Sequence, residues 1–226
     1  MTSFVPQAPL AILGGTFDPL HIGHLRVALE AADALGGELR LMPASVPPHR
    51  EQPVATAAQR VAILRAGLSG QHRLRLDERE LSRAGPSYTI DTLMELRDEI
   101  GSDRSLVLLL GRDAFCGLPN WHCWRALFNY AHIGVLSRPG HPLAMPDELA
   151  SEVSSRFISP ASLVGQGAFG QVFEIAVSAL EISATAIREL LGRGGDPRYL
   201  LPDAVVDDAS LLKPYSNIRS GDAIDE

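Results

Sequence analysis

Two histidines, His21 and His24, follow a glycine-rich turn near the start of this 226-residue chain. The stretch from Leu10 to Leu25 reads LAILGGTFDPLHIGHL, which is an apolar run, a glycine pair, a turn and the start of an amphipathic helix. An apolar run bounded by glycines is typical of a buried strand. A strand, a tight turn and a helix N-terminus favour phosphate binding, because free backbone N–H groups meet the positive end of the helix dipole there. The two imidazoles are three residues apart, so we expect them to share one face and point the same way.

The glycine pair does not fit either common phosphate-binding pattern, because no Walker lysine follows it and the stretch is not G-x-G-x-x-G. GGTFDPLHIGHL instead resembles the T/H-x-G-H signature of the nucleotidylyltransferase superfamily. In that family the loop glycines let ATP phosphates approach the backbone, and both histidines contact phosphate oxygens in the transition state. The resemblance implies catalytic roles for His21 and His24. It implies ATP contacts for Gly14, Gly15, Thr16 and Phe17. The alternative is a pair of surface histidines beside an ordinary turn.

The remaining pattern alternates strands with helices, which predicts an α/β fold: a Rossmann-like, doubly wound parallel sheet with flanking helices and a small C-terminal helical part. Further strands are expected at Glu38–Met42, His72–Asp77, Ser105–Gly111, His132–Leu136 and Gln171–Val177. Helices are expected to start at Thr56, at Ser87 or Thr89, and at Ser183 or Thr185. The charged run 77–83 is expected to be solvated, and 139–161 to be irregular. The segment 165–172, GQGAFGQV, resembles a kinase glycine loop, but no lysine follows it on the next strand, so we expect a loop or hairpin.

Length and composition favour one domain. With 46% hydrophobic residues, the chain can bury a core spanning about residues 8–212, and we expect 213–226 to be a disordered tail. A net charge of −7 argues against a broad nucleic-acid-binding face. No segment resembles a membrane span or a signal peptide. Two cysteines cannot form a disulfide framework or a four-ligand zinc site, so a reducing cytoplasm is expected. Both a monomer and a homo-oligomer are compatible with the sequence.

Three motifs beyond the first strand point to a mononucleotide site. The prolines of PPHR would hold His49 and Arg50 at the carboxyl edge of the sheet, although a rigid surface loop is the alternative. PPHR, PSYT and LPNW together resemble the bacterial nicotinate mononucleotide adenylyltransferases. By that resemblance, the Thr89 hydroxyl and the Ile90 N–H face the nicotinate carboxylate, the Trp121 ring stacks on the pyridine, and the His122 amide helps bind the carboxylate. The implied mononucleotide contacts are completed by His49 and by Arg138, which could reach phosphate or ribose.

A second helix start is expected to face phosphate. In EISATAIRELL a capped helix would place Arg188 one turn in, near an anion at that terminus. The segment resembles the I-S-x-T-x-x-R motif that closes the ATP triphosphate site in this family. This implies a catalytic role for Arg188 and ATP contacts for Ile182, Ser183 and Thr185, while Ala184 replaces a serine that many members carry. Gly111 and Asp113 follow the central strand. Asp113 could accept ribose hydroxyls or hold a cation beside ATP, or it could simply cap a helix.

The motifs together predict adenylyl transfer from ATP to nicotinate mononucleotide, giving deamido-NAD and pyrophosphate. Mg²⁺ is expected to be carried mainly by the ATP phosphates, with no metal site on the protein. One alternative is a related transferase that accepts nicotinamide mononucleotide or phosphopantetheine. Another is a class I aminoacyl-tRNA synthetase fragment, since residues 21–24 read HIGH, but the K-M-S-K-S loop is missing. The third is a module that senses ATP without turnover.

Overall fold

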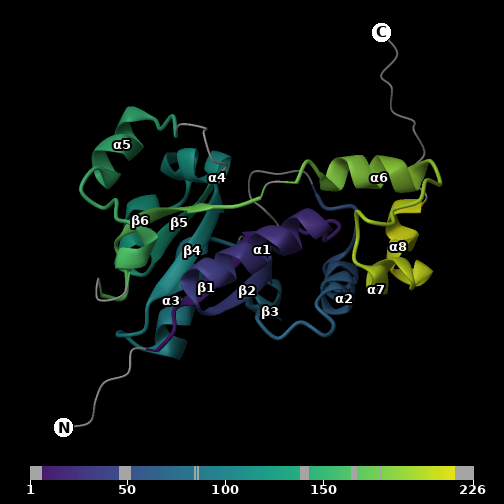
Figure 1. Ribbon diagram of the computed structural model, residues 1–226, viewed down its shortest axis with the longest axis horizontal. Coiled ribbons are helices and arrows are strands. Elements are labelled where there is room, and N and C mark those ends of the chain that lie inside the picture. The colour runs from purple at the N-terminus through teal and green to yellow at the C-terminus, as the bar shows by residue number, and fades with distance from the viewer. Residues whose placement is uncertain are drawn as a thin grey trace.

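Six parallel strands form the centre of the molecule, as the computed structural model in Figure 1 shows. The structure describes residues 7–45, 52–83, 85, 87–137, 143–163, 167–178 and 180–216. The strands are β1 (Leu10–Gly15), β2 (Glu38–Pro43), β3 (Leu74–Leu76), β4 (Leu106–Gly111), β5 (His132–Ser137) and β6 (Val172–Ala176). Their order in the sheet is β3-β2-β1-β4-β5-β6, and every pairing is parallel. This is the Rossmann order, so the predicted fold class is confirmed.

Helices cover both faces of the sheet. They are α1 (Ile22–Leu35), α2 (Ala57–Gly67), α3 (Thr89–Ile100), α4 (Arg112–Cys116), α5 (Asp147–Val153), α6 (Ala184–Gly192), α7 (Asp203–Val206) and α8 (Ala209–Ser216). Four short 3₁₀ segments lie at Arg79–Ser82, Leu118–Asn120, Trp124–Asn129 and Pro160–Ser162. In β1, Ala11 and Leu13 join the core cluster beneath α1, α2, α6, α7 and α8, whereas Leu10 and Ile12 join the cluster beneath α3, α4 and α5. Both faces of the sheet are therefore buried, which explains its continuous apolar strands.

The chain reverses direction across the sheet between β1 and β4. The strand sequence proceeds outward from β1 to β2 and β3, then crosses back to β4 and proceeds the other way. Ile12 of β1 pairs with Leu108 of β4, so both strands end at the same edge, at Gly15 and Gly111. Ligands of open α/β sheets bind at the carboxyl edge beside such a reversal. The predicted phosphate turn lies there.

The predicted solvated run 77–83 is instead part of an ion-pair network. β3 is three residues long, shorter than predicted, and the chain then enters the 3₁₀ segment Arg79–Ser82. The Arg79 guanidinium lies 2.7 Å from Asp77 and 2.6 Å from Glu99 of α3, and Arg40 of β2 also contacts both carboxylates. Although burial alone raises it, hydrogen bonds from Arg79 hold the pKa of Asp77 below its usual value. Asp77 and Arg79 are thus paired with charged side chains of β2 and α3.

The structure decides three other expectations. Helix α3 starts at Thr89, one of the two predicted starts, with Tyr88 as its N-cap. Within the segment 139–161, which was expected to be irregular, residues Asp147–Val153 form α5. The described residues 167–171 form a loop that leads into β6, which pairs in parallel with β5, so the loop alternative is confirmed and the hairpin alternative is wrong.

The C-terminal helix extends beyond the predicted core boundary at residue 212. Helix α8 continues to Ser216, and the Tyr215 side chain is 0% exposed. Figure 1 shows α6, α7 and α8 gathered with α2 at one end of the molecule. Residues 213–216 therefore belong to the packed structure, and the remainder of the predicted tail, 217–226, lies outside the described residues.

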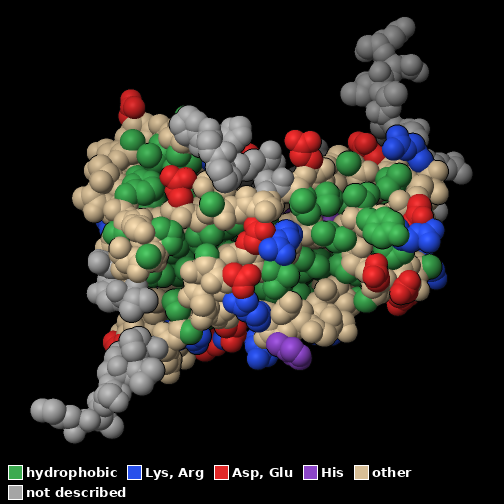
Figure 2. All heavy atoms as spheres, in the orientation of Figure 1, with side chains coloured by type: hydrophobic (Ala, Val, Ile, Leu, Met, Phe, Trp, Pro, Cys, Tyr) green, Lys and Arg blue, Asp and Glu red, His purple; other side chains and the backbone are tan. Residues whose placement is uncertain are grey.

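Surface charges are mixed on the face drawn in Figure 2, where Lys and Arg side chains lie among Asp and Glu side chains. None of the helices in the described part of the chain has the length and apolar character that a bilayer crossing requires.

A buried histidine in β5 predicts how stability depends on pH. His132 is 0% exposed; its Nδ1 accepts the Gln171 N–H at 3.2 Å and its Nε2 donates to the Gly167 carbonyl at 3.2 Å. Burial lowers its pKa from 6.5 to about 4. Between these two values the unfolded chain binds a proton that the native chain excludes, so the free energy of unfolding must fall as pH drops from 6.5 to about 4.

When pH falls from 7.5 to 4.5, we expect the free energy of unfolding of wild type to decrease by about 2 kcal/mol more than that of His132→Gln. Urea unfolding of wild type and the variant at several pH values measures this difference. The two stability curves should converge as pH falls, and curves that run parallel would contradict the assignment.

Candidate active site

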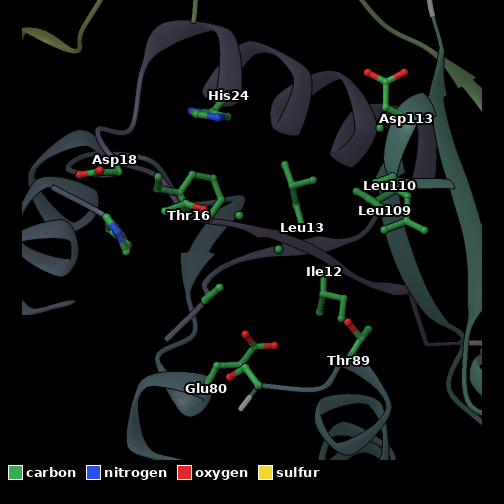
Figure 3. A pocket seen from close by; sticks show the side chains of 18 of the residues that line it. Ile12, Leu13, Thr16, Asp18, His24, Glu80, Thr89, Leu109, Leu110 and Asp113 are labelled. Atoms are coloured by element: carbon green, nitrogen blue, oxygen red, sulfur yellow. The ribbon is translucent and has the colours of Figure 1, made fainter. Parts of the chain in front are cut away.

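A cavity of about 890 Å³ opens at the carboxyl edge of the sheet between β1 and β4. Figure 3 shows His24 at the start of α1 on one side, Glu80 and Thr89 on the opposite side, and Thr16 of the turn between them. Of the predicted site residues, the following line this cavity: Gly14, Gly15, Thr16, Phe17, His24, Thr89, Gly111, Asp113, Trp121, His122, Thr185 and Arg188. Segments far apart in the sequence thus meet around one space.

The two histidines cap the helix that they begin. His21 is the N-cap of α1, and its Nδ1 accepts the His24 N–H at 3.3 Å. His24 Nδ1 in turn accepts the His21 N–H at 3.4 Å, which completes a reciprocal capping box. The rings stack with centroids 3.6 Å apart and planes 20° apart. Their spacing of three residues therefore serves the helix start as well as the cavity.

This arrangement defines the protonation state of both rings. A ring nitrogen that accepts a hydrogen bond carries no proton, so each neutral imidazole holds its proton on Nε2. Burial lowers the pKa of His21 to about 4, and burial together with the neighbouring His21 lowers the pKa of His24 to about 3. Both rings are neutral Nε2–H donors at neutral pH. His24 lines the cavity, whereas His21 is 6% exposed and lies outside the cavity lining.

Gly23 explains why the motif has a glycine between its histidines. A Cβ at this position would lie 3.0 Å from His21 Nδ1 and 3.1 Å from His21 Cε1. Any side chain would therefore displace the ring that caps α1 and stacks on His24. Phe17 supports the pair from the other side: its ring meets the His24 ring edge-on with centroids 5.1 Å apart. Phe17 itself is 2% exposed, which leaves mainly its backbone for ligand contacts.

The amides of α1 are less available to phosphate than the sequence suggested. The Ile22 N–H donates to the Leu200 carbonyl at 2.9 Å, and the His24 N–H donates to His21. These first-turn donors already have protein acceptors, so the expectation of free N–H groups there is wrong for these two residues. The His24 imidazole is the side chain of this helix start that lines the cavity.

Helix α6 supplies the second helix start. Ser183 is its N-cap and accepts the Ala186 N–H at 3.1 Å, so the capping alternative resolves to Ser183 rather than Thr185. Ala184 and Thr185 line the cavity as the first two helical residues, positions whose N–H groups have no acceptor within the helix. Arg188 donates to the Asp18 carbonyl at 2.8 Å and to the Thr185 hydroxyl at 3.3 Å. Its guanidinium is thereby fixed at the cavity wall.

The two helix starts converge, as the sequence predicted. Arg188 of α6 reaches the turn that leads into α1, and a Cβ on Gly23 would lie 3.6 Å from Cβ of Ile182. Ile182 therefore packs beside the start of α1, outside the cavity lining, and Ser183 lies outside that lining as well. Both contribute by placing α6 rather than by lining the cavity with their side chains.

The opposite wall carries the residues predicted for the pyridine. Thr89 and Trp121 line the cavity, and the His122 ring lies against the Tyr88 ring with centroids 4.4 Å apart. The Ile90 side chain is 6% exposed and belongs to the core, so only its backbone N–H in the first turn of α3 is available.

Gly111 is the N-cap of α4 and Asp113 lies in the first turn of that helix. Asp113 is therefore not the cap, and its exposed carboxylate borders the cavity.

Glu80 is a cavity residue that sequence reasoning missed. It lies in the charged run that was expected to be solvated, yet its carboxylate accepts the Thr92 hydroxyl at 2.9 Å and lines the cavity. Burial raises the pKa of Glu80, partly offset by the Thr92 hydrogen bond. Asp18 was also missed, although it lies within the quoted turn motif. His49 and Arg138 lie outside the described residues.

The carboxylates that line the cavity, among the described residues, are those of Asp18, Glu80 and Asp113. Among the described residues, no group of three or more His, Cys, Asp or Glu side chains could hold a metal ion. Figure 3 shows these three carboxylates on different sides of the cavity. Cys116 and Cys123 are both free thiols.

Fold and site together define an α/β nucleotide-binding protein with an imidazole pair at its switch point. The cytidylyltransferase-like family model matches residues 12–190. Probable nicotinate-nucleotide adenylyltransferases of Pseudomonas aeruginosa UCBPP-PA14 and Pseudomonas putida W619 are each 48% identical, over 88% and 87% of this chain and 92% and 90% of their own lengths. The chain therefore belongs to the cytidylyltransferase-like family, among the nicotinate-nucleotide adenylyltransferases.

Solved structures share the fold. Plasmodium falciparum nicotinic acid mononucleotide adenylyltransferase complexed with NaAD has a TM-score of 0.65 at 16% identity, covering 92% of this chain and 96% of that one. The same enzyme complexed with APC has a TM-score of 0.60, also at 16% identity and with the same coverage.

Proposed function

We propose that the protein transfers the adenylyl group of ATP to nicotinate mononucleotide, giving deamido-NAD and pyrophosphate. The observation that carries this proposal is the convergence of the neutral His24 donor and the Arg188 guanidinium at one cavity between β1 and β4. Family membership identifies the reaction class, and the relatives' names specify the acceptor. The reaction supplies a dinucleotide precursor for NAD biosynthesis.

The reaction needs no covalent intermediate on the protein. A phosphate oxygen of the mononucleotide attacks the α-phosphorus of ATP in line, and the bond from that phosphorus to the bridging oxygen breaks as pyrophosphate leaves. The mononucleotide phosphate is already ionised, so no enzymic base is required. The protein must align two polyanions and stabilise the charge that develops on the leaving group; such alignment can lower the barrier by about 7–11 kcal/mol.

Each wall of the cavity takes one part of this task. His24, Arg188 and the N–H groups at the start of α6 donate to the triphosphate, and His21 fixes the tautomer and orientation of His24. On the other wall, Thr89 and the Ile90 N–H accommodate the nicotinate carboxylate, Trp121 stacks on the pyridine and the His122 amide adds a donor. Gly14, Gly15, Thr16 and Phe17 provide backbone close to ATP, and Asp113 beyond Gly111 accepts ribose hydroxyls. His49 and Arg138, which lie outside the described residues, are proposed as further mononucleotide-binding residues.

Mg²⁺ enters this proposal bound to ATP. Mg²⁺ commonly binds through substrate phosphates, and in this proposal the ion would neutralise part of the ATP charge. ATP as a substrate and two free cysteines support a cytoplasmic setting for the reaction.

A substrate comparison tests the proposal directly. With ATP and nicotinate mononucleotide, the protein should release pyrophosphate, and kcat/KM should be at least about tenfold higher than with nicotinamide mononucleotide. The groups proposed to contact the nicotinate, namely the Thr89 hydroxyl and the Ile90 and His122 N–H groups, are donors that suit a carboxylate, whereas an amide also needs an acceptor. Turnover of phosphopantetheine instead would show that the protein is a related transferase with a different acceptor. ATP binding with no pyrophosphate release from any acceptor would indicate a sensing module.

A further inference from the structure

A buried carboxylate of the active-site turn joins three segments. Asp18 is 5% exposed, although aspartate is rarely buried without partners. Its Oδ2 accepts the Val54 N–H at 2.7 Å, and its Oδ1 accepts the Ala55 N–H at 3.1 Å. The third donor is the hydroxyl of Tyr215, at 2.8 Å from Oδ1. The turn before His21, the approach to α2 and the end of α8 thus meet at one side chain.

Tyr215 makes this contact from the far end of the chain. It is 0% exposed, and its ring belongs to the core cluster beneath α1 and α2. Burial, followed by the neighbouring Asp18 charge, raises the pKa of Tyr215 above its usual range, so the phenol remains a proton donor. The apolar ring alone would pack equally well as phenylalanine. The presence of a hydroxyl at position 215 is therefore explained by its hydrogen bond to Asp18 and not by packing in the core.

Two arginines hold the backbone of the same turn. Arg60 of α2 is 1% exposed and donates to the Thr16 carbonyl at 2.7 Å and to the Ala44 carbonyl at 2.9 Å. Arg188, which lines the cavity, donates to the Asp18 carbonyl at 2.8 Å. Tyr215 holds the Asp18 side chain, and the Asp18 carbonyl accepts a hydrogen bond from Arg188. A shift of Asp18 therefore also displaces Arg188, which faces the triphosphate.

We propose that Tyr215 is a positioning residue for adenylyl transfer: through Asp18, helix α8 sets the placement of the turn Thr16–Asp18 and of Arg188 at the cavity. This inference rests on the function proposed above. Tyr215 touches no substrate, so its effect must be geometric. Small errors in the alignment of reacting groups lower the rate strongly while leaving ground-state binding nearly intact.

Three variants test this role. Tyr215→Phe keeps the ring and removes only the hydroxyl, and we expect kcat to fall about tenfold with the KM values for both substrates within about twofold of wild type. Leu212→Ala is the matched control on the same helix: Leu212 is 8% exposed and makes no hydrogen bond to Asp18. It should lower the melting temperature at least as much as Tyr215→Phe but leave kcat unchanged. In an Asp18→Asn background, Tyr215→Phe should have little further effect on kcat.

Hydrogen exchange separates this inference from the proposed function. The Val54 and Ala55 amides, which donate to Asp18, should exchange at least about tenfold faster in Tyr215→Phe than in wild type or Leu212→Ala. If wild type releases no pyrophosphate, the proposed function fails, and the exchange rates still decide whether Tyr215 holds Asp18. Unchanged exchange at both amides would overturn the inference. So would wild-type kcat in Tyr215→Phe, or a loss of kcat in Leu212→Ala that matches its loss of stability.

Discussion

Replacement of His24 by alanine is expected to lower kcat by about 10²–10³-fold while leaving the protein folded, which is the typical loss for one preorganised donor to developing charge. His24 is the imidazole of the pair that lines the cavity, and its proton is on Nε2 because Nδ1 accepts the His21 N–H. A neutral donor in a buried site needs no reorganisation when charge moves onto the leaving phosphates. Steady-state pyrophosphate release and circular dichroism measure the two parts of the prediction.

The choice of controls for His24 separates chemistry from folding. His72 is exposed and outside the cavity, so His72→Ala should behave as wild type. His21→Ala removes an N-cap as well, and it should therefore destabilise the protein by about 1 kcal/mol in addition to lowering activity. Activity of His24→Ala within a few-fold of wild type would refute the assigned role.

Most of the fold could be predicted from the sequence because its signals are local. Each central strand is a short apolar run bounded by turn residues, and Thr56 caps α2 and Ser183 caps α6, as their side-chain chemistry indicated. Helix α5 was missed because it has seven residues and buries only Leu149 and Val153, too few positions for a visible period. The end of α8 was missed because one aromatic in a polar segment gives no periodic signal.

The candidate site also has a part with a local sequence signal and a part that depends on residues distant in the chain. The imidazole pair is encoded within four residues and could be predicted, whereas the partners that complete it come from elsewhere in the chain. Leu200 satisfies the Ile22 N–H, and Tyr215 reaches Asp18 across 197 positions. Glu80 was assigned to solvent because a charged run usually faces water. Only the folded chain shows the Thr92 hydroxyl that turns it toward the cavity.

Substitution of Arg188 by alanine is expected to lower kcat/KM for ATP by about 10²–10³-fold, because it removes both a cation from the triphosphate wall and the donor that holds the Asp18 carbonyl. Arg188→Lys keeps the charge but lacks the planar fork that lets one side chain serve the turn and a phosphate together, so an intermediate loss of about tenfold is expected. Initial rates at varied ATP measure both. Arg193→Ala is the matched control, since Arg193 is exposed at the end of the same helix and outside the cavity lining. If Arg188→Ala and Arg193→Ala gave equal rates, the Arg188 guanidinium would have no part in transfer, and the triphosphate would have to be bound by His24 and the N–H groups at the start of α6.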